Sequence, residues 1–150
     1  MIIKLIFLLT LVFANFWAFR IKDRSISGIT WGLTLGALLL LFAPQQWSQF
    51  GLYVYMAATL ATLIYGLVAK QKSFQQRSTI SLMAVATFTF WLWTTMHWHG
   101  NTLLMPAFVL LIGFAGIIRQ LKLKKELGLL LIFAVDAALI LLEHWLKINA

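Results

Sequence analysis

One acidic residue, Asp136, lies in the middle of an otherwise apolar run, residues 131–138. A charged side chain at bilayer depth is costly, and such residues usually face the interior of a helix bundle and mark a path for an ion, a proton or a substrate. No lysine or arginine lies at a comparable depth in the sequence. We therefore expect Asp136 either to be protonated and hydrogen-bonded to a hydroxyl group, or to pair with a group outside this chain.

The charges that follow Asp136 are spaced as a polar stripe. Glu143 and Lys147 come seven and eleven residues later, which places all three on one face of a helix. A stripe of this kind is typical of a route for a proton, a cation or a cationic substrate. The alternative is one buried acid held by a hydroxyl group, with a separate Glu143–Lys147 pair at the membrane rim.

Hydroxyl groups that could meet the acid occur in another apolar run. Tyr55, Thr59, Thr62 and Gly66 share one helical face. Thr59 and Thr62 therefore join Asp136 and Glu143 as candidates for lining a substrate or ion path. Threonines in such helices often bond only to a carbonyl of their own preceding turn, so the pattern permits this role without specifying it.

All three histidines lie near one predicted membrane face. His97 and His99 end one apolar run and His144 ends another. Imidazole binds metals and haem, so a metal or haem site beside Glu143 is one interpretation, although His97 and His99 point to nearly opposite sides of a helix. Anchoring at the membrane interface is the other interpretation. The tryptophans expected at the same rim are Trp47, Trp98 and Trp145.

The elements that position these residues must lie in lipid. The 150 residues are 62% hydrophobic and 11% charged, whereas a soluble domain is about half apolar and about a quarter charged. A domain of this size still exposes roughly a third of the surface of its unfolded chain, so the apolar excess cannot be hidden from water. The absence of cysteine excludes disulfides, thiolate metal sites and catalytic thiols. The composition predicts an integral membrane protein.

Six uncharged runs come close to the roughly 20 residues that cross the hydrocarbon core. A helix satisfies its own backbone hydrogen bonds in lipid, and no run alternates with a period of two, so we predict an all-α, polytopic bundle of six transmembrane helices. The helices pair as three hairpins with short loops in a single domain, residues 1–150. The predicted spans are residues 2–19, 27–43, 50–69, 79–97, 102–118 and 127–146.

Basic residues alternate between the loops. Ten of the twelve lie in the first, third and fifth loops, and the two other loops contain none. By the positive-inside rule the basic loops face the cytoplasm and both termini lie on the other side. The bacterial inner membrane is the expected location, although an organelle membrane would give the same pattern. The ten residues are Arg20, Lys22, Arg24, Lys70, Lys72, Arg77, Arg119, Lys122, Lys124 and Lys125.

The net charge of +8 does not indicate nucleic-acid binding. The basic residues lie in short loops beside membrane helices, where topology and contact with anionic lipid account for them. Asp23 and Glu126 lie in the same loops among these bases. A general acid–base pair could therefore be built only from Asp136, Glu143 and the histidines.

Gly28, Gly32 and Gly36 are four residues apart in the second predicted span. Glycines at this spacing share a helical face and let a neighbouring backbone approach closely. We favour packing within the bundle, with Ala57 and Ala61 as the complementary small surface. The alternative is a face that binds a membrane protein partner or a second copy of the chain.

Three functions fit these observations. The first is a transport component or membrane subunit that recognises a small solute, an ion or a lipid, with Asp136 as its polar centre. The second is an intramembrane or interfacial enzyme acting on a lipid or quinone, with a haem or metal at the outer rim. The third is a structural subunit of a larger complex. We favour the first, because no catalytic motif is present and a scaffold does not need an unpaired acid at membrane depth.

Overall fold

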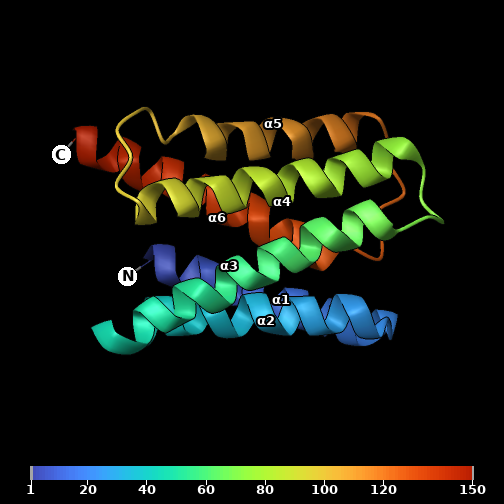
Figure 1. Cartoon of the computed structure of the whole chain (residues 1–150), viewed down its shortest axis with the longest axis horizontal. Helices are drawn as coiled ribbons and strands as arrows, with labels where there is room; N and C mark the ends of the chain where they lie inside the picture. The colour runs from blue at the N-terminus through green and yellow to red at the C-terminus, as the bar shows by residue number, and fades with distance from the viewer. Residues whose placement is uncertain (1, 150) are drawn as a thin grey trace.

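The computed structural model describes residues 2–149, and its regular structure is entirely helical. Six helices run side by side and reverse direction at each connection (Figure 1). The predicted all-α bundle is therefore confirmed. The helices are α1 (Ile2–Ile21), α2 (Arg24–Phe42), α3 (Gln45–Val68), α4 (Phe74–Thr95), α5 (Leu104–Ile118) and α6 (Leu127–Asn149).

Four helices within residues 2–149 are long and apolar enough to cross a membrane, namely α1, α2, α3 and α6. The 22-residue α4 has the length but is less apolar, and α5 is apolar but only 15 residues long. Fifteen residues of helix rise about 22 Å, which is less than the ~30 Å of a hydrocarbon core. The bundle is compatible with an integral membrane location, and helix length and composition support four of the six predicted spans.

Capping side chains extend the helices beyond the predicted spans. Asp23 accepts hydrogen bonds from backbone N–H groups of the first turn of α2. Ser73 and Gln76 form a reciprocal capping box at the start of α4. A search for uncharged runs stops at such polar residues, whereas a helix needs them at its N-terminus. As a result α2 and α4 begin three and five residues before their predicted spans. α3 also begins five residues early, directly after Pro44, without a capping side chain.

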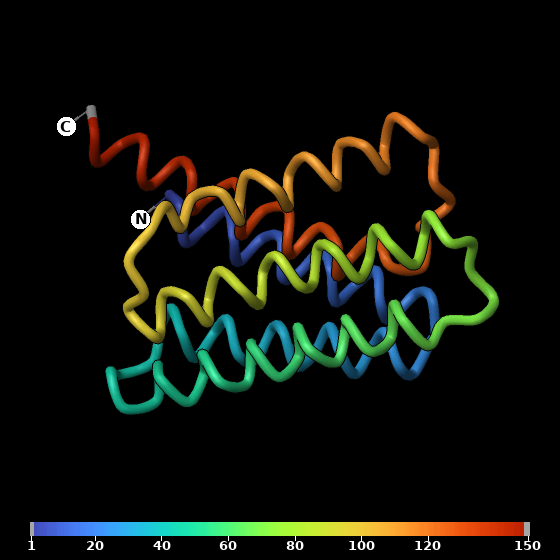
Figure 2. The backbone as a smooth tube through the Cα atoms, turned by 45° about the horizontal axis from the view of Figure 1, so that its top comes forward, coloured from blue at the N-terminus to red at the C-terminus, as the bar shows by residue number. Residues whose placement is uncertain are grey.

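The three basic loops gather at one end of the bundle, and both chain ends lie toward the other end (Figures 1 and 2). The packing does not single out the three predicted hairpins, because α2 packs most extensively on α3, and α1 packs more on α6 than on α2. Each helix contacts the next along the chain, and α6 returns to α1. The bundle is therefore a closed ring, and α6 also contacts α2 and α4.

The outside of the bundle is apolar, and part of its interior is polar. Phe16, Phe19 and Phe114 are exposed, whereas Thr30 and Thr59 are fully buried. The buried threonine hydroxyls donate to carbonyls three or four residues earlier in their own helices. Extensive exposed apolar surface is what a protein with lipid as its solvent presents.

A close backbone contact joins α2 to α3. A Cβ atom on Gly36 would lie 2.6 Å from the backbone nitrogen of Tyr55 and 2.9 Å from the carbonyl oxygen of Gly51. Backbone atoms cannot yield as a flexible side chain can, so this approach requires glycine. The contact fixes the backbone from which the Tyr55 side chain projects.

The other two glycines of the motif behave differently. Gly32 lies against Ala58, so the prediction that Ala57 and Ala61 form the complementary surface is wrong. A Cβ atom on Gly28 would have nothing within 4 Å. Internal packing therefore accounts for Gly32 and Gly36, and Gly28 takes no part in it.

The ring closes where α6 meets α1. A Cβ atom on Gly128 would lie 2.9 Å from the carbonyl oxygen of Ala14, so the two backbones touch near the basic end. The indole N–H of Trp17 donates to the carbonyl of Lys124 at 2.7 Å and ties α1 to the α5–α6 loop. These contacts hold the start of α6 in place.

We expect the Gly36→Ala substitution to lower the free energy of unfolding by about 1–3 kcal/mol, because the added methyl group meets backbone atoms. The matched control is Gly28→Ala, which meets open space and should be neutral or stabilise the helix by up to about 1 kcal/mol. Denaturant unfolding in mild detergent, followed by circular dichroism, measures both. Equal stability of the two variants would contradict the close contact.

Candidate functional site

Asp136 lies on the inner face of α6. Leu129, Ile132, Phe133 and Ala137 are buried on this helix, and position 136 continues their spacing. Asp136 is 9% exposed, so its carboxylate lies inside the bundle. The apolar stripe that packs α6 against its neighbours thus carries the acid into the interior.

Two neutral donors from two other helices hold the Asp136 carboxylate. The hydroxyl of Tyr55 on α3 and the indole N–H of Trp91 on α4 each donate to Oδ2 at 3.1 Å. The two rings contact each other edge to face, with centroids 6.1 Å apart. Oδ1 accepts no hydrogen bond from the residues that the structure describes. One oxygen is therefore fixed, and the other is available.

A small cavity reaches Asp136 from the end of the bundle where the chain termini lie. Its volume is about 110 Å³, and Lys4 and Glu143 line it together with Asp136, Tyr55 and Trp91. The remaining lining residues are Ile3, Phe7, Ala37, Leu40, Leu41, Leu139 and Ile140. Two charged groups and one buried acid therefore share a cavity that is otherwise mostly apolar.

Among the described residues, no cation forms an ion pair with Asp136. Within residues 2–149 the ion pairs between side chains are Lys72–Glu126 at 2.6 Å and Lys147–Glu143 at 2.8 Å. Lys4 instead donates to the carbonyl of Leu41 at 3.0 Å. The sequence left open a buried acid held by a hydroxyl group together with a separate Glu143–Lys147 pair. Both contacts are present, because Tyr55 donates to Asp136 and Glu143 pairs with Lys147. In addition, Asp136 and Glu143 line the same cavity.

Glu126 forms a second buried carboxylate site, at the basic end of the bundle. It is 0% exposed, and its Oε1 accepts a hydrogen bond from the Tyr65 hydroxyl at 2.9 Å and pairs with Lys72. Oε2 is buried without a hydrogen-bond partner. Glu126 lies in a loop beside a basic residue, as the sequence indicates, but the loop folds inward and buries it.

The two buried carboxylates and their two tyrosine donors have the same spacing along the chain. Tyr55 and Tyr65 are ten residues apart on α3, and their acceptors Asp136 and Glu126 are ten residues apart in the opposite direction. The backbones of α3 and α6 make no close contact in the described chain. Long tyrosine side chains bridge the space between these two antiparallel helices at two levels.

Thr59 and Thr62 do not reach Asp136. Both are fully buried, but their hydroxyls donate to the carbonyls of Met56 at 2.7 Å and Ala58 at 2.9 Å. Neither residue lines the cavity at the acid. Of the hydroxyl groups on this face, Tyr55 is the one that meets the carboxylate.

The structure does not gather the histidines into a ligand set. His97, His99 and His144 are all exposed. No group of three or more His, Asp or Glu side chains placed to hold a metal occurs among residues 2–149. The exposed positions fit anchoring at the interface, as do those of Trp47 and Trp98.

Sequence reasoning missed Trp91, Tyr65, Lys72 and Glu126. The matching intervals of ten residues, between two tyrosines in one run and two acids in another, were a usable signal for Tyr65 and Glu126. Trp91 carried no such signal, because an indole at a helix end usually indicates the membrane interface.

A broad basic cavity lies beside the Glu126 site. Its volume is about 840 Å³, and it opens between the α3–α4 and α5–α6 loops. One acid, Asp23, lines it together with five lysines. The lysines are Lys70, Lys72, Lys122, Lys124 and Lys125.

We expect Asp136→Asn to fold with a change in unfolding free energy below about 1 kcal/mol, because one amide oxygen can accept both hydrogen bonds now made to Oδ2. Asp136→Leu leaves the donors of Tyr55 and Trp91 without an acceptor and should cost about 1–3 kcal/mol. Thermal and denaturant unfolding in detergent compare the two variants. An Asn variant as unstable as the Leu variant would contradict the two-donor geometry.

We expect Lys72→Met to destabilise the protein by about 3 kcal/mol, since it leaves the buried Glu126 carboxylate without a cation. Glu126→Gln should cost less, because Lys72 is 14% exposed and can turn toward the basic cavity. The double variant should recover part of the loss, and a double-mutant cycle measures the coupling. Strictly additive effects would show that the pair does not stabilise the fold.

Comparison of the chain with protein-family models, with curated proteins and with solved structures finds no match. A function for this protein is therefore argued from the contacts of its own side chains.

Proposed function

We propose that this protein is a transport component of a membrane, in which Asp136 binds and releases a proton as an ion or small solute passes. The observation that carries the proposal is a buried acid that forms no ion pair within residues 2–149, at a cavity shared with Lys4 and Glu143. Retaining such a group at bilayer depth is costly, and acids of this kind commonly serve as proton relays.

The geometry at Asp136 supports exchange of a proton. Tyr55 and Trp91 both occupy Oδ2 and fix the orientation of the carboxyl group. Oδ1 is then the oxygen on which a proton can be taken up and lost without breaking either hydrogen bond. Glu143 lies at the same cavity and is 54% exposed, so it can pass protons between water and the interior.

The size of the cavity favours an ion over a larger substrate. A volume of about 110 Å³ has room for a few water molecules, whereas pockets for drug-sized ligands measure about 300–1,000 Å³. A lipid or quinone does not fit beside Asp136. No histidine lines the cavity either, so the alternative of an enzyme acting on such a substrate gains no support at this position.

We further infer that all six helices cross the membrane, with both termini on the non-cytoplasmic side. The support is the placement of the three basic loops at one end of the bundle and of the chain ends toward the other. α5 would cross a locally thinned region or extend through its flanking residues. A bacterial inner membrane is the proposed location, because its proteins follow this distribution of basic loops.

The test is proton uptake by vesicles that contain the purified protein and a trapped pH-sensitive dye. A potassium gradient with valinomycin imposes an inside-negative potential. We expect faster acidification than in protein-free vesicles, and loss of this excess in Asp136→Asn. The matched control is Asp23→Asn, which makes the same change at a helix N-cap where asparagine serves equally well.

Infrared difference spectra between acidic and alkaline buffer provide a second measurement. The wild type should show the carbonyl band of a protonated carboxyl group that Asp136→Asn removes and Asp23→Asn retains. Wild-type uptake by Asp136→Asn, or spectra unchanged by that substitution, would contradict the proposal. The direct readout of proton binding does not depend on knowing which solute is carried.

A further inference from the structure

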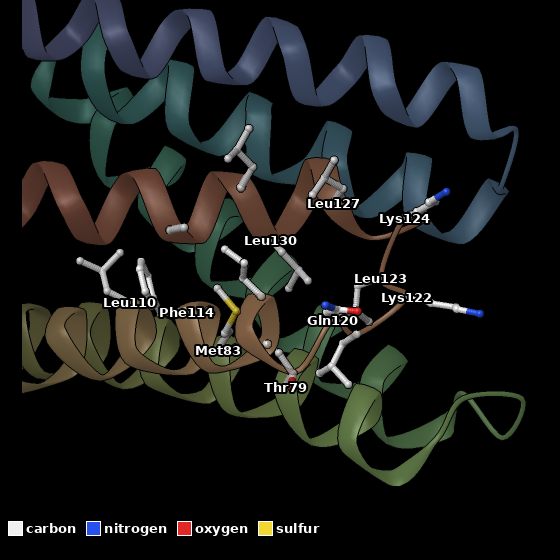
Figure 3. A pocket seen from close by; sticks show the side chains of 16 residues that line it. Thr79, Met83, Leu110, Phe114, Gln120, Lys122, Leu123, Lys124, Leu127 and Leu130 are labelled. Carbon is white, nitrogen blue, oxygen red and sulfur yellow. The ribbon is translucent and has the colours of Figure 1, made fainter.

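A groove of about 450 Å³ runs between α4, α5 and α6 near the basic end of the bundle. Its walls are almost entirely apolar, and Leu110, Phe114, Met83 and Leu130 lie along it (Figure 3). The groove shares no lining residue with the cavity at Asp136.

Small residues create the groove. Gly113 and Gly116 on α5 and Ala134 on α6 line it. A Cβ atom on Gly113 would lie 3.6 Å from Met83 Cε, and one on Gly116 would lie 3.5 Å from Thr79 Cγ2. These are ordinary contact distances, so neither glycine is required for helix packing. Their effect is to leave room for an apolar group from outside the chain.

Lysines stand at the end of the groove. Lys122 and Lys124 line both the groove and the basic cavity of about 840 Å³. Figure 3 shows their side chains extending from the loop, with the ammonium groups away from the apolar residues. The loop is fixed, since Gln76 Nε2 donates to the carbonyl of Lys122 at 3.2 Å and Trp17 to that of Lys124.

The positive charge at this position is not neutralised within residues 2–149. Lys72 pairs with Glu126, but Lys70, Lys122, Lys124 and Lys125 form no ion pair there. The remaining acid of the cavity, Asp23, caps α2. The apolar groove therefore ends at Lys122 and Lys124, which also line the basic cavity together with Lys70 and Lys125, and none of the four forms an ion pair within residues 2–149.

We propose that this groove and its lysines bind one anionic phospholipid, with an acyl chain along α5 and α6 and the phosphate at Lys122 and Lys124. The charges complement a phosphodiester, and the groove accepts a chain at the depth where lipid tails lie. The tail is equally apolar in bulk lipid, so selectivity must come from the headgroup. The proposal is independent of proton binding at Asp136.

The test is native mass spectrometry of the detergent-purified chain with added lipid. The probes are phosphatidylglycerol and phosphatidylcholine with identical acyl chains. We expect preferential retention of one phosphatidylglycerol, weakened about thirtyfold in the double variant Lys122→Gln/Lys124→Gln. The matched control Arg20→Gln/Lys22→Gln removes the same charge from another loop at the same end and should retain wild-type binding.

A second pair of variants tests the groove without changing charge. Gly113→Leu fills it and should weaken retention of phosphatidylglycerol, whereas Gly28→Leu extends into open space elsewhere and should not. Glycerol phosphate, which has the anionic group but no chains, should bind far more weakly.

Three results would overturn the proposal. Equal retention of the two lipids would remove the headgroup selectivity. Binding of glycerol phosphate as strong as that of the lipid would assign the lysines to a soluble anion. A dimer that Gly113→Leu dissociates would assign the groove to a second copy of the chain.

Discussion

Lipid offers no hydrogen bond to a polar side chain, so each polar group that enters the bundle needs a partner within it. Most buried threonines donate to a carbonyl of their own helix and make no bond to another helix. A smaller set of polar side chains forms hydrogen bonds from one helix to another, and these bonds link particular pairs of helices. Asn15 reaches Thr34 at 2.6 Å between α1 and α2, and the tyrosines of α3 reach the acids of α6 and its preceding loop.

The two buried acids have similar tyrosine partners but different electrostatic surroundings. Lys72 compensates Glu126, so that site suits a structural role, in which charge is balanced and the α3–α4 loop is held against the start of α6. Asp136 has two neutral donors and no ion pair within residues 2–149. Hydrogen bonds of this type contribute about 0.5–1.5 kcal/mol each, or somewhat more to a charged acceptor, and leave the charge itself unbalanced. The two sites therefore differ in charge balance, because Glu126 is paired with a cation and Asp136 is held by neutral donors.

Hydropathy and periodicity predicted much of this architecture. The six helices, the separation of the basic loops from the uncharged ones and the inward position of Asp136 all follow from runs and spacings in the sequence. The shared helical face included Tyr55, but it did not separate Tyr55 from Thr59 and Thr62, which bond within their own helix instead. These features depend on one helix at a time, and the period of a helix is known in advance.

Features that depend on how two helices are rotated against each other were not predictable. The helical period indicated that small residues of α3 face the glycines of α2, but it did not distinguish Ala58, which makes the contact, from Ala57. Trp91 resembles an interfacial anchor in the sequence, and only the packing of α4 on α6 turns its indole to Asp136. Glu126 lies among bases in a loop, and its burial depends on long-range contacts such as that of Trp17 with Lys124, 107 residues away.

The contact of Gly128 with Ala14 has a consequence for the order in which the chain assembles. α1 is synthesised long before α6, so the surface of α1 that packs on α6 has no protein partner while the intervening helices are made. Contacts between segments this distant in sequence form slowly, because a long loop must close first. The same helix, α6, makes the contact with α1 that closes the ring and carries Asp136 to Tyr55 and Trp91. Both the closed ring and the buried acid therefore depend on the last helix of the chain to be synthesised.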